Sequence, residues 1–464
     1  MSKPTIPQGT RDFGATELKK RYYLINTIKQ VFECYGYTPL ETPTMENLST
    51  LTGKYGDEGE KLLYRVLNSG DFLSKTTSEN FTDYKKLTPK IAEKGLRYDL
   101  TVPFARYVVM HQHELIFPYK RYQIQPVWRA DRPQKGRYRE FYQCDADVVG
   151  TTSLLNEAEL TQMYDSVFAQ LGLKTLIKIN NRKILQAIAH YANAEDSLVS
   201  MTIAIDKLDK IGRDGVAKEL TQQGFSDQQI EDIFGCIFYA DTSNDAANKV
   251  QNLGHIELLQ QKFADRNIEV GLRGIAEMKT VLHYLESYAF TNILEFDATL
   301  ARGLGYYTGT IWEVKADEGT LKSSIGGGGR YDDLTSIFGL KNMSGVGISF
   351  GLDRIYDILE ETNKWQLANQ SHVRLIFINF GGDAELTAFQ YVAELRQKGI
   401  AVELYPEATK MDKQMKYANA RQIPLVGFVG EEELKNQQIK VKNMQTGEQQ
   451  SVSLTDLLGL LTQV

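Results

Sequence analysis

The segment from Ser344 to Gly351, Ser-Gly-Val-Gly-Ile-Ser-Phe-Gly, constrains the fold more than any other part of the chain. Successive residues of a β-strand point to opposite faces of the sheet, so Val346, Ile348 and Phe350 share one face, and glycine and serine share the other. Glycine weakens a strand unless another group must approach the backbone closely. The pattern therefore predicts one packed face and one nearly bare face on which a flat ligand lies. Tight packing within the sheet is the alternative.

Arg354 comes directly after this strand, in the first turn of a helix predicted over residues 352–361. The helix macrodipole disfavours a cation at this end by roughly 0.3 to 1 kcal/mol. We expect a bound anion to compensate for that cost. A surface ion pair of Arg354 is the alternative.

A second constellation runs from Val127 to Gln143, where one predicted strand ends, a basic loop turns at Gly136 and another strand begins. Arginine binds phosphate oxygens through a planar fork, and Phe141 offers a ring on which a base can stack. The pattern is typical of a hairpin that grasps phosphate. The alternative is a solvated charged face made by the basic residues of this region. These residues are Lys120, Arg121, Arg129, Arg132, Lys135, Arg137 and Arg139.

Glycine is also concentrated in Arg302-Gly-Leu-Gly-Tyr-Tyr and in the four successive glycines of residues 326–329. Ser324 and Ile325 precede the four glycines, and Arg330 follows them without a spacer. This arrangement favours a pocket wall or a sharp turn over a flexible tether. The sequence contains neither a P-loop nor a Gly-x-Gly-x-x-Gly fingerprint after a first strand, so we exclude those two kinds of nucleotide site.

A chain of 464 residues exceeds the ~100 to 200 residues of a typical domain, so two to four domains are expected. Apolar residues at helical spacing predict an amphipathic helix over residues 15–35, which Gly36 ends. Pro39 and Pro43 restrict the extended segment that follows to an edge strand or a boundary. A long helix followed by an edge strand invites pairing with a second subunit.

Strand-type sequence at residues 96–148 and 293–350 predicts a mostly antiparallel sheet. Helical periodicity between residues 182 and 280 predicts a helical insertion. A polar linker is expected at residues 362–371. Buried strand runs then alternate with helices over residues 372–464, as in a small α/β domain.

Composition indicates a soluble protein, because 42% of the residues are apolar, 24% are charged, and no apolar stretch approaches the roughly 18 residues of a membrane span. The first residues lack the pattern of a secretory signal or a transit peptide, so we expect a cytoplasmic protein. Cys34, Cys144 and Cys236 are scattered, which argues against disulfides and structural zinc and predicts small buried side chains. The net charge of -6 does not exclude nucleic acid, because binding needs only a local basic patch.

Together these residues resemble the motifs of the class II aminoacyl-tRNA synthetases, and the resemblance to the histidyl-tRNA synthetase family extends over nearly the whole chain. The first helix with Pro43 resembles motif 1, Arg129 to Gln143 resembles motif 2, and Gly345 to Arg354 resembles motif 3. Arg302-Gly-Leu-Gly-Tyr-Tyr and Gly328-Gly-Arg-Tyr-Asp332 resemble the two signatures peculiar to the histidine family.

The resemblance implies an α+β fold, with a catalytic domain built on an antiparallel sheet in two parts, residues 1–181 and 281–361. The helical insertion at 182–280 separates them, and the linker at 362–371 leads to a C-terminal α/β anticodon-binding domain at 372–464. The implied reaction is the ATP-dependent ligation of L-histidine to the 3′ end of tRNA(His) through a histidyl-adenylate, releasing AMP and pyrophosphate. ATP with Mg²⁺ would be the substrate complex, the enzyme would be a homodimer, and no structural metal is expected.

By the same resemblance, Arg129 would hold the α-phosphate, and Arg302 would stabilise charge in the transition state. The implied ATP-binding residues are Arg129, Asp131, Arg137, Phe141 and Arg354. Of these, Phe141 would stack on adenine and Asp131 would contact it. Family members commonly carry a polar residue in place of Gly305, which bears on the rigidity of the Arg302 loop, and Glu in place of Asp353.

The implied histidine pocket has two parts. Asp99, Thr101 and Gln143 would receive the α-amino group. The imidazole would be surrounded by Asp147, Tyr307 and Tyr331, and Tyr306 belongs to the same set. A buried carboxylate and a phenol suit a ring with one donor and one acceptor nitrogen. Other amino acids would leave these groups unpaired, a penalty that can reach ~10⁴-fold without editing, so we expect no editing site.

Lys410, Lys413 and Lys416 can share one helical face toward tRNA, and a solvated helix is the alternative there. Three rival functions remain to be weighed. A regulatory paralogue that binds histidine or ATP usually lacks the histidine signatures or the C-terminal domain, and both are present in this sequence. Residues 302–307 argue against a ligase for threonine, proline or glycine, and a pure RNA-binding protein would leave the glycine-faced strand unexplained.

Overall fold

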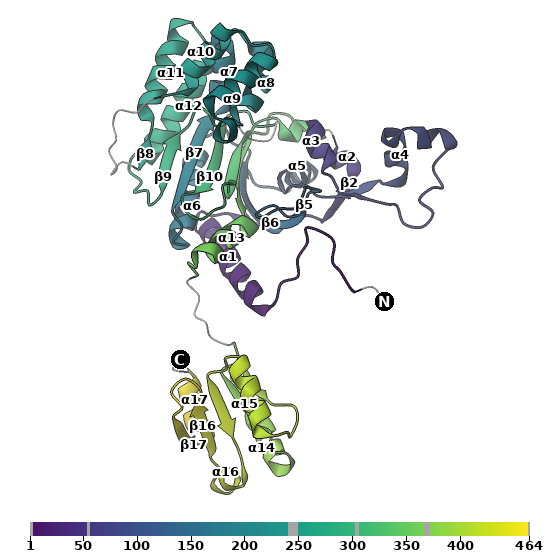
Figure 1. The fold of residues 1–464 in the computed structure, drawn as a ribbon, viewed down its shortest axis with the longest axis vertical. Helices are drawn as coiled ribbons and strands as arrows, with labels where there is room; N and C mark the ends of the chain where they lie inside the picture. The colour runs from purple at the N-terminus through teal and green to yellow at the C-terminus, as the bar shows by residue number, and fades with distance from the viewer. Residues whose placement is uncertain (1–2, 53–55, 240–248, 302–305, 366–371, 463–464) are drawn as a thin grey trace. The chain divides into compact units, whose positions relative to one another are not determined.

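The computed structural model describes residues 3–52, 56–239, 249–301, 306–365 and 372–462. Arg302 and Gly305 lie outside these ranges. The chain forms two compact units, residues 1–366 and 367–464, and each unit has a sheet of its own (Figure 1).

A nine-stranded sheet lies at the centre of the first unit. Its strands, in the order in which they pair, are β1 (Thr38–Pro39), β5 (Tyr119–Trp128), β6 (Glu140–Val149), β12 (Gly345–Gly351), β11 (Gly326–Tyr331), β10 (Thr310–Ala316), β7 (Thr175–Asn181), β9 (Ile293–Phe296) and β8 (Val250–Gln251). Pairing is antiparallel from β5 to β7 and parallel at both ends. The predicted mostly antiparallel sheet is confirmed, and β1 with its Pro39 is an edge strand as expected.

Three helices, α1 (Ala15–Cys34), α6 (Leu155–Gln170) and α13 (Leu352–Thr362), cover one face of this sheet (Figure 1). Phe350, on the predicted apolar face of β12, is fully buried. Its ring centroid lies 5.8 Å from that of Phe32, 4.9 Å from that of Tyr164 and 5.5 Å from that of Phe168. The helix α1 ends as predicted before Gly36, whose φ of 78° costs glycine little strain.

The segment predicted as a helical insertion is helical. It contains α7 (Arg182–Tyr191), a 3-10 turn at Glu195–Ser197, α8 (Leu198–Ile205), α9 (Leu208–Gln222), α10 (Asp227–Ile237), α11 (Leu253–Asp265) and α12 (Glu269–Leu285). Ser226 begins α10 with a capping box, in which Gln229 N–H donates to the serine hydroxyl and the Gln229 side chain accepts from Ser226 N–H. The two-residue strand β8, which was not predicted, lies within this segment and extends the central sheet.

A small sheet between α1 and β5 was also not predicted. It consists of β2 (Met45–Asn47), β4 (Lys94–Leu96) and β3 (Arg65–Val66). The helices of this region are α2 (Leu48–Leu51), α3 (Gly56–Lys61), a 3-10 turn at Ser78–Thr82, α4 (Tyr84–Ile91) and α5 (Thr101–Met110). The part that carries α4 projects from the rest of the first unit as an arm (Figure 1).

The second unit confirms the predicted alternation of strands and helices. Its strands, in pairing order, are β14 (Val402–Leu404), β13 (Leu375–Phe377), β15 (Leu425–Phe428), β16 (Ile439–Asn443) and β17 (Gln449–Val452). Its helices are α14 (Gly382–Gln397), α15 (Met411–Ala420), α16 (Glu431–Asn436) and α17 (Leu454–Thr462). The first three strands are parallel, whereas β15, β16 and β17 pair antiparallel. The β16–β17 hairpin was not predicted.

Two further observations concern the described residues. None of their helices is long and apolar enough to cross a membrane, and no group of three or more of their His, Cys, Asp and Glu side chains could hold a metal ion. Cys144 and Cys236 are buried as predicted. The prediction is wrong for Cys34, which is exposed at the end of α1 because it lies on the solvent side of that helix.

Candidate active site

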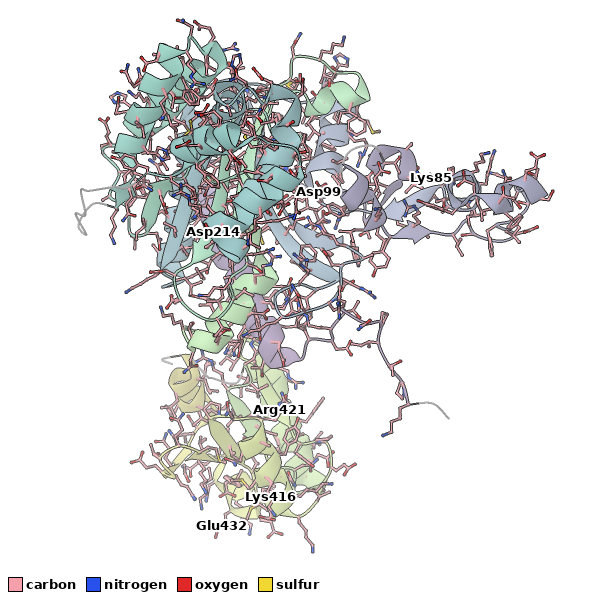
Figure 2. The ribbon with its side chains drawn as sticks, turned by 45° about the horizontal axis from the view of Figure 1, so that its top comes forward. Lys85, Asp99, Asp214, Lys416, Arg421 and Glu432 are labelled. Atoms are coloured by element: carbon pink, nitrogen blue, oxygen red, sulfur yellow. The ribbon has the colours of Figure 1, made fainter. Side chains whose placement is uncertain are left out.

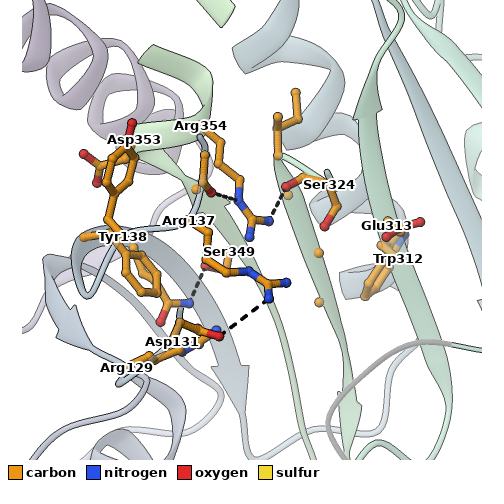
Figure 3. Close-up of a pocket in the computed structure, with 18 of the residues that line it drawn as sticks. Arg129, Asp131, Arg137, Tyr138, Trp312, Glu313, Ser324, Ser349, Asp353 and Arg354 are labelled. Carbon is orange, nitrogen blue, oxygen red and sulfur yellow. Dashed lines mark hydrogen bonds and ion pairs between the residues drawn. The ribbon is translucent and has the colours of Figure 1, made fainter. Parts of the chain in front are cut away.

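A cavity lies over the strands β10, β11 and β12, beside the loop between β5 and β6 and the start of α13 (Figure 3). All five residues predicted to bind ATP line it: Arg129, Asp131, Arg137, Phe141 and Arg354. Gly326, Gly327 and Gly328 also line it, so the successive glycines form a pocket wall as predicted, within a strand and not at a turn. The cavity therefore brings together the segments that resemble motif 2, motif 3 and both histidine signatures, because Gly328 and Tyr307 also line it.

Three arginines reach the cavity from different segments of the chain. Arg354 donates from Nε to the Gly136 carbonyl oxygen at 2.8 Å and from Nη1 to the Ser324 carbonyl oxygen at 2.6 Å (Figure 3). Arg129 lies with its guanidinium carbon 5.2 Å from the Phe141 ring centroid. Arg137 Nη1 is 3.6 Å from Asp131 Oδ1. Three guanidinium groups around one cavity suit a polyanion such as a triphosphate, because arginine contacts phosphate oxygens through several donors at once.

The basic residues between 120 and 139 do not form one solvated face. Arg121 is fully buried, and its Nη2 is 2.9 Å from Asp147 Oδ2. Lys120 pairs with Glu159 at 2.6 Å. The alternative of a common charged surface is therefore wrong.

The residues predicted to bind histidine gather next to the ATP candidates, and Gln143 and Tyr307 line the cavity. Gln143 donates from Nε2 to Ser349 Oγ at 3.0 Å. Asp147 lies four residues after Gln143 in β6, on the same face of the strand. It is buried and accepts a hydrogen bond from the Tyr331 hydroxyl at 2.6 Å.

The other part of the predicted histidine pocket precedes α5. Asp99 is buried, and its Oδ1 accepts from the Val102 N–H at 3.1 Å, so this carboxylate is held at the helix start (Figure 2). Thr101 is the first residue of α5. The Tyr306 hydroxyl donates to Asp99 Oδ2 at 3.5 Å, and its ring lies 6.2 Å from that of Tyr331. Asp99, Tyr306, Tyr331 and Asp147 are thus linked in a layer beside the cavity.

The glycine face of β12 is not bare along its whole length. A Cβ atom on Gly347 would lie 2.0 Å from Asp147 Oδ1, and one on Gly345 would lie 2.3 Å from Tyr331 Cε2. These glycines therefore make room for two side chains of the predicted histidine pocket. The expectation of a ligand over the entire face is corrected: only Ser349 and Gly351 of this strand line the cavity.

Burial sets the protonation of this layer. It raises the pKa of the Tyr331 phenol well above its ordinary value, and the neighbouring Asp147 carboxylate raises it further. Burial also raises the pKa of the Tyr307 phenol, and the negative charge of Asp147 raises it as well. Both phenols therefore remain protonated at neutral pH and can donate hydrogen bonds.

Two residues of the site were not predicted to have a role. Asp145 is buried on β6 between Gln143 and Asp147, and its place in their two-residue period is the signal that could have identified it. Asp353 was noted only as a departure from the family pattern. Its Oδ1 accepts from Arg21 at 2.6 Å and its Oδ2 from the Tyr142 N–H at 2.8 Å, so it joins α1, β6 and α13.

The lysines predicted to face tRNA lie at the start of α15 in the second unit. Lys410 is the residue directly before this helix, and Lys413 is exposed. Lys416 is also exposed (Figure 2). Lys416 Nζ is 2.8 Å from Asp412 Oδ2, and Lys413 Nζ is 3.8 Å from Glu407 Oε2. Neighbouring acids thus offset part of their positive charge.

Comparison with known proteins agrees with this arrangement. The sequence model of the family described as histidyl-tRNA synthetase matches residues 9–355, and that of the anticodon binding domain matches residues 372–463. Proteins named histidine--tRNA ligase from Bacteroides fragilis (strain YCH46) and Christiangramia forsetii are each 51% identical, over 99% of this chain and 99% of theirs. The crystal structure of histidyl-tRNA synthetase from Nostoc sp. PCC 7120 superposes with a TM-score of 0.81 at 29% identity and covers 100% of both chains. The chain therefore belongs to the histidyl-tRNA synthetase family.

Proposed function

We propose that this protein ligates L-histidine to the 3′ end of tRNA(His) in two steps, using ATP as its magnesium complex. The observation that carries the proposal is the meeting of three cavity arginines with the buried Asp147–Tyr331 pair. The first set suits a triphosphate, and the second suits an imidazole, which needs one hydrogen-bond acceptor and one donor. Family membership supports both assignments.

In the first step, a carboxylate oxygen of histidine attacks the α-phosphorus of ATP, and the bond from that phosphorus to the β-bridging oxygen breaks. The products are histidyl-adenylate and pyrophosphate. Arg129 would contact the α-phosphate, and Arg137 and Arg354 the outer phosphates, where fixed cations stabilise the charge that develops on the oxygens. Mg²⁺ bound to ATP would neutralise part of the same charge. Arg302 would act beside the α-phosphate, so its loss should lower the rate more than the binding.

In the second step, a hydroxyl oxygen of the terminal tRNA ribose attacks the adenylate carbonyl carbon. The bond from that carbon to the phosphate oxygen breaks, AMP leaves, and the proton of the hydroxyl passes to water. Within the site, Phe141 would stack on adenine and Asp131 would contact it. Asp99, Thr101 and Gln143 would bind the α-amino group, while Asp147, Tyr306, Tyr307 and Tyr331 would enclose the imidazole.

The remaining assignments complete the proposal. Residues 1–181 and 281–361 would form the catalytic domain, with the insertion at 182–280, the linker at 362–371 and the anticodon-binding domain at 372–464. Lys410, Lys413 and Lys416 would contact tRNA. We place the protein in the cytoplasm as a homodimer, which light scattering at micromolar concentration tests, since a monomer would contradict it.

Charging of tRNA tests the reaction directly. With ATP, Mg²⁺ and radiolabelled histidine, the protein should convert tRNA(His) to a histidyl ester that mild base hydrolyses. Arg129→Ala should lower the rate by about 10²- to 10³-fold, as expected for the loss of a group that stabilises transition-state charge. Arg132→Ala is the matched control, because Arg132 is exposed in the same loop. Equal rates for the two variants would contradict the role of Arg129.

A further inference from the structure

Asp145 is a buried carboxylate for which the reaction above has no role. Only 2% of it is exposed, and it lies on the same face of β6 as Gln143 and Asp147. Ser349 lies opposite it on β12 and supplies a hydrogen bond to it. Its Oδ1 atom is buried and has no hydrogen-bond partner among the described residues.

Several polar atoms near Asp145 are also buried without a hydrogen-bond partner within the described ranges. Gln143 Oε1 and the Nε and Nη1 atoms of Arg121 are also buried without a partner in the described part of the chain. Buried polar atoms in native proteins nearly always have a partner, in the protein, in ordered water or in a ligand. Since Gln143 and Ser349 both line the cavity, a group that enters from the cavity can reach this cluster.

The charges of the cluster indicate what kind of ligand group would enter it from the cavity. Asp99, which would also contact the α-amino group, already accepts hydrogen bonds from the Val102 N–H and the Tyr306 hydroxyl. Asp147 accepts from the Tyr331 hydroxyl and is paired with Arg121. Asp145 accepts a hydrogen bond from the neutral hydroxyl of Ser349, and the cation that acts on it, Arg121, is already paired with Asp147. A buried carboxylate without a paired cation is costly, and a ligand cation would remove that cost.

We propose that Asp145 binds the α-ammonium group of the amino-acid substrate, next to Gln143, as a further specificity-determining residue. The inference rests on the proposed function, because it takes histidine as the ligand. The imidazole of histidine is mostly neutral at pH 7, so the ammonium group is the full cation that the molecule carries. Loss of one hydrogen bond to a charged group should weaken binding by about 10- to 100-fold.

A dependence on pH follows from the surroundings of Asp145. Burial, with smaller contributions from Asp147 and Asp99 and against the opposing charge of Arg121, raises its pKa to about 7. The titratable groups that interact electrostatically with it are Arg121, Asp99, Asp147, Cys144, Tyr164 and Tyr307. A bound cation favours the ionised carboxylate, so the affinity for the ligand should rise from pH 6 to pH 8 and binding near pH 7 should release a proton to the buffer.

Calorimetric titration with two histidine analogues tests the proposal. Histidinol keeps the amine and lacks the carboxylate, whereas 3-(imidazol-4-yl)propionate keeps the carboxylate and lacks the amine. Asp145→Asn should lower the affinity for histidine and for histidinol by about 10- to 100-fold. It should change the affinity for the propionate by less than about threefold. The proton released on histidine binding, measured in buffers of different ionisation enthalpy, should disappear in the variant. Asp145→Ser should behave in the same way if Asp145→Asn does not fold.

Glu295→Gln is the matched control. Glu295 is a half-buried carboxylate of β9, near the far edge of the same sheet, and burial also raises its pKa. Its replacement should leave the binding of all three ligands unchanged. Equal weakening of histidinol and the propionate by Asp145→Asn would overturn the proposal in favour of a purely structural role, and so would unchanged binding of both. Failure of the unaltered protein to bind histidine would instead overturn the proposed function.

Discussion

Arg21 donates to Asp353 Oδ1 at 2.6 Å, and both side chains are buried. The same carboxylate accepts from Arg11 and, at 2.8 Å, from the Tyr142 N–H. One side chain thus connects the first helix, the strand after the basic loop and the last helix of the first unit. These three elements carry the segments that resemble motifs 1, 2 and 3, so the cavity depends on this connection.

Replacement of Asp353 should destabilise the first unit. Asp353→Ala leaves the buried Arg21 without its charge partner, and we expect a loss of about 3 to 5 kcal/mol in the free energy of unfolding. Urea denaturation followed by circular dichroism measures the change. Glu360→Ala is the control, because the partly exposed Lys20–Glu360 pair joins the same two helices and should contribute at most about 1 kcal/mol. Similar losses for both variants would contradict this account.

Breaking the buried ion pair of Arg330 and Glu157 should also destabilise the first unit. Arg330 Nε and Nη2 donate to the two Glu157 carboxylate oxygens at 2.5 and 2.8 Å, and both side chains are buried. Glu157→Gln removes the negative charge and should lower the free energy of unfolding by about 3 kcal/mol or more. Glu159→Gln, in the same helix but in a partly exposed pair with Lys120, should cost about 1 kcal/mol or less. A larger loss for Glu159→Gln would be the contrary result.

Loss of the Tyr331 hydroxyl should weaken the binding of the amino acid and leave the binding of the nucleotide unchanged. Tyr331→Phe removes the 2.6 Å hydrogen bond to Asp147, so the orientation of the carboxylate toward the imidazole is no longer fixed. We expect KM for histidine to rise by about 10-fold or more, with KM for ATP within about twofold. Steady-state pyrophosphate exchange measures both. In Tyr164→Phe, the lost hydroxyl lies behind the sheet, 3.3 Å from the Ser349 carbonyl oxygen, and KM for histidine should not change.

Gly347 should tolerate no side chain. Its added Cβ atom would lie 2.0 Å from Asp147 Oδ1, so Gly347→Ala must displace that carboxylate. Histidine-dependent exchange should fall by at least about 100-fold, because a displacement of about 1 Å within a site can have that effect. Gly235→Ala, in a helix where the nearest atom is the flexible end of Lys262 at 3.8 Å, should retain full activity. Full activity of Gly347→Ala would show that the reaction does not depend on the position of the Asp147 carboxylate.

Local patterns predicted a large part of the fold and the site. The alternation in residues 344–351 identified the two faces of β12, because strand geometry has a period of two. The arginines and the phenylalanine of one hairpin likewise predicted a phosphate-binding loop with a ring for a base, and Arg129, Arg137 and Phe141 all line the cavity.

Other features have no local signal. Glu157 and Arg330 are 173 residues apart, and Arg21 and Asp353 are 332 apart, so nothing in either segment indicates its partner. The strand β8 has two residues, too few for an alternating pattern. Asp145 comes two residues after the segment that resembles motif 2, and its burial and its unpaired oxygen follow from the sheet that surrounds it.

Amino-acid-dependent exchange of labelled pyrophosphate into ATP, measured with each of the twenty amino acids in turn, tests the central claim most directly. The account predicts exchange with histidine alone, lowered by about 10²- to 10³-fold in Arg129→Ala and strongly reduced in Arg302→Ala. Exchange with another amino acid would contradict the assignment of the pocket. No exchange with any amino acid, despite histidine binding, would contradict the ligase itself and indicate a regulatory relative.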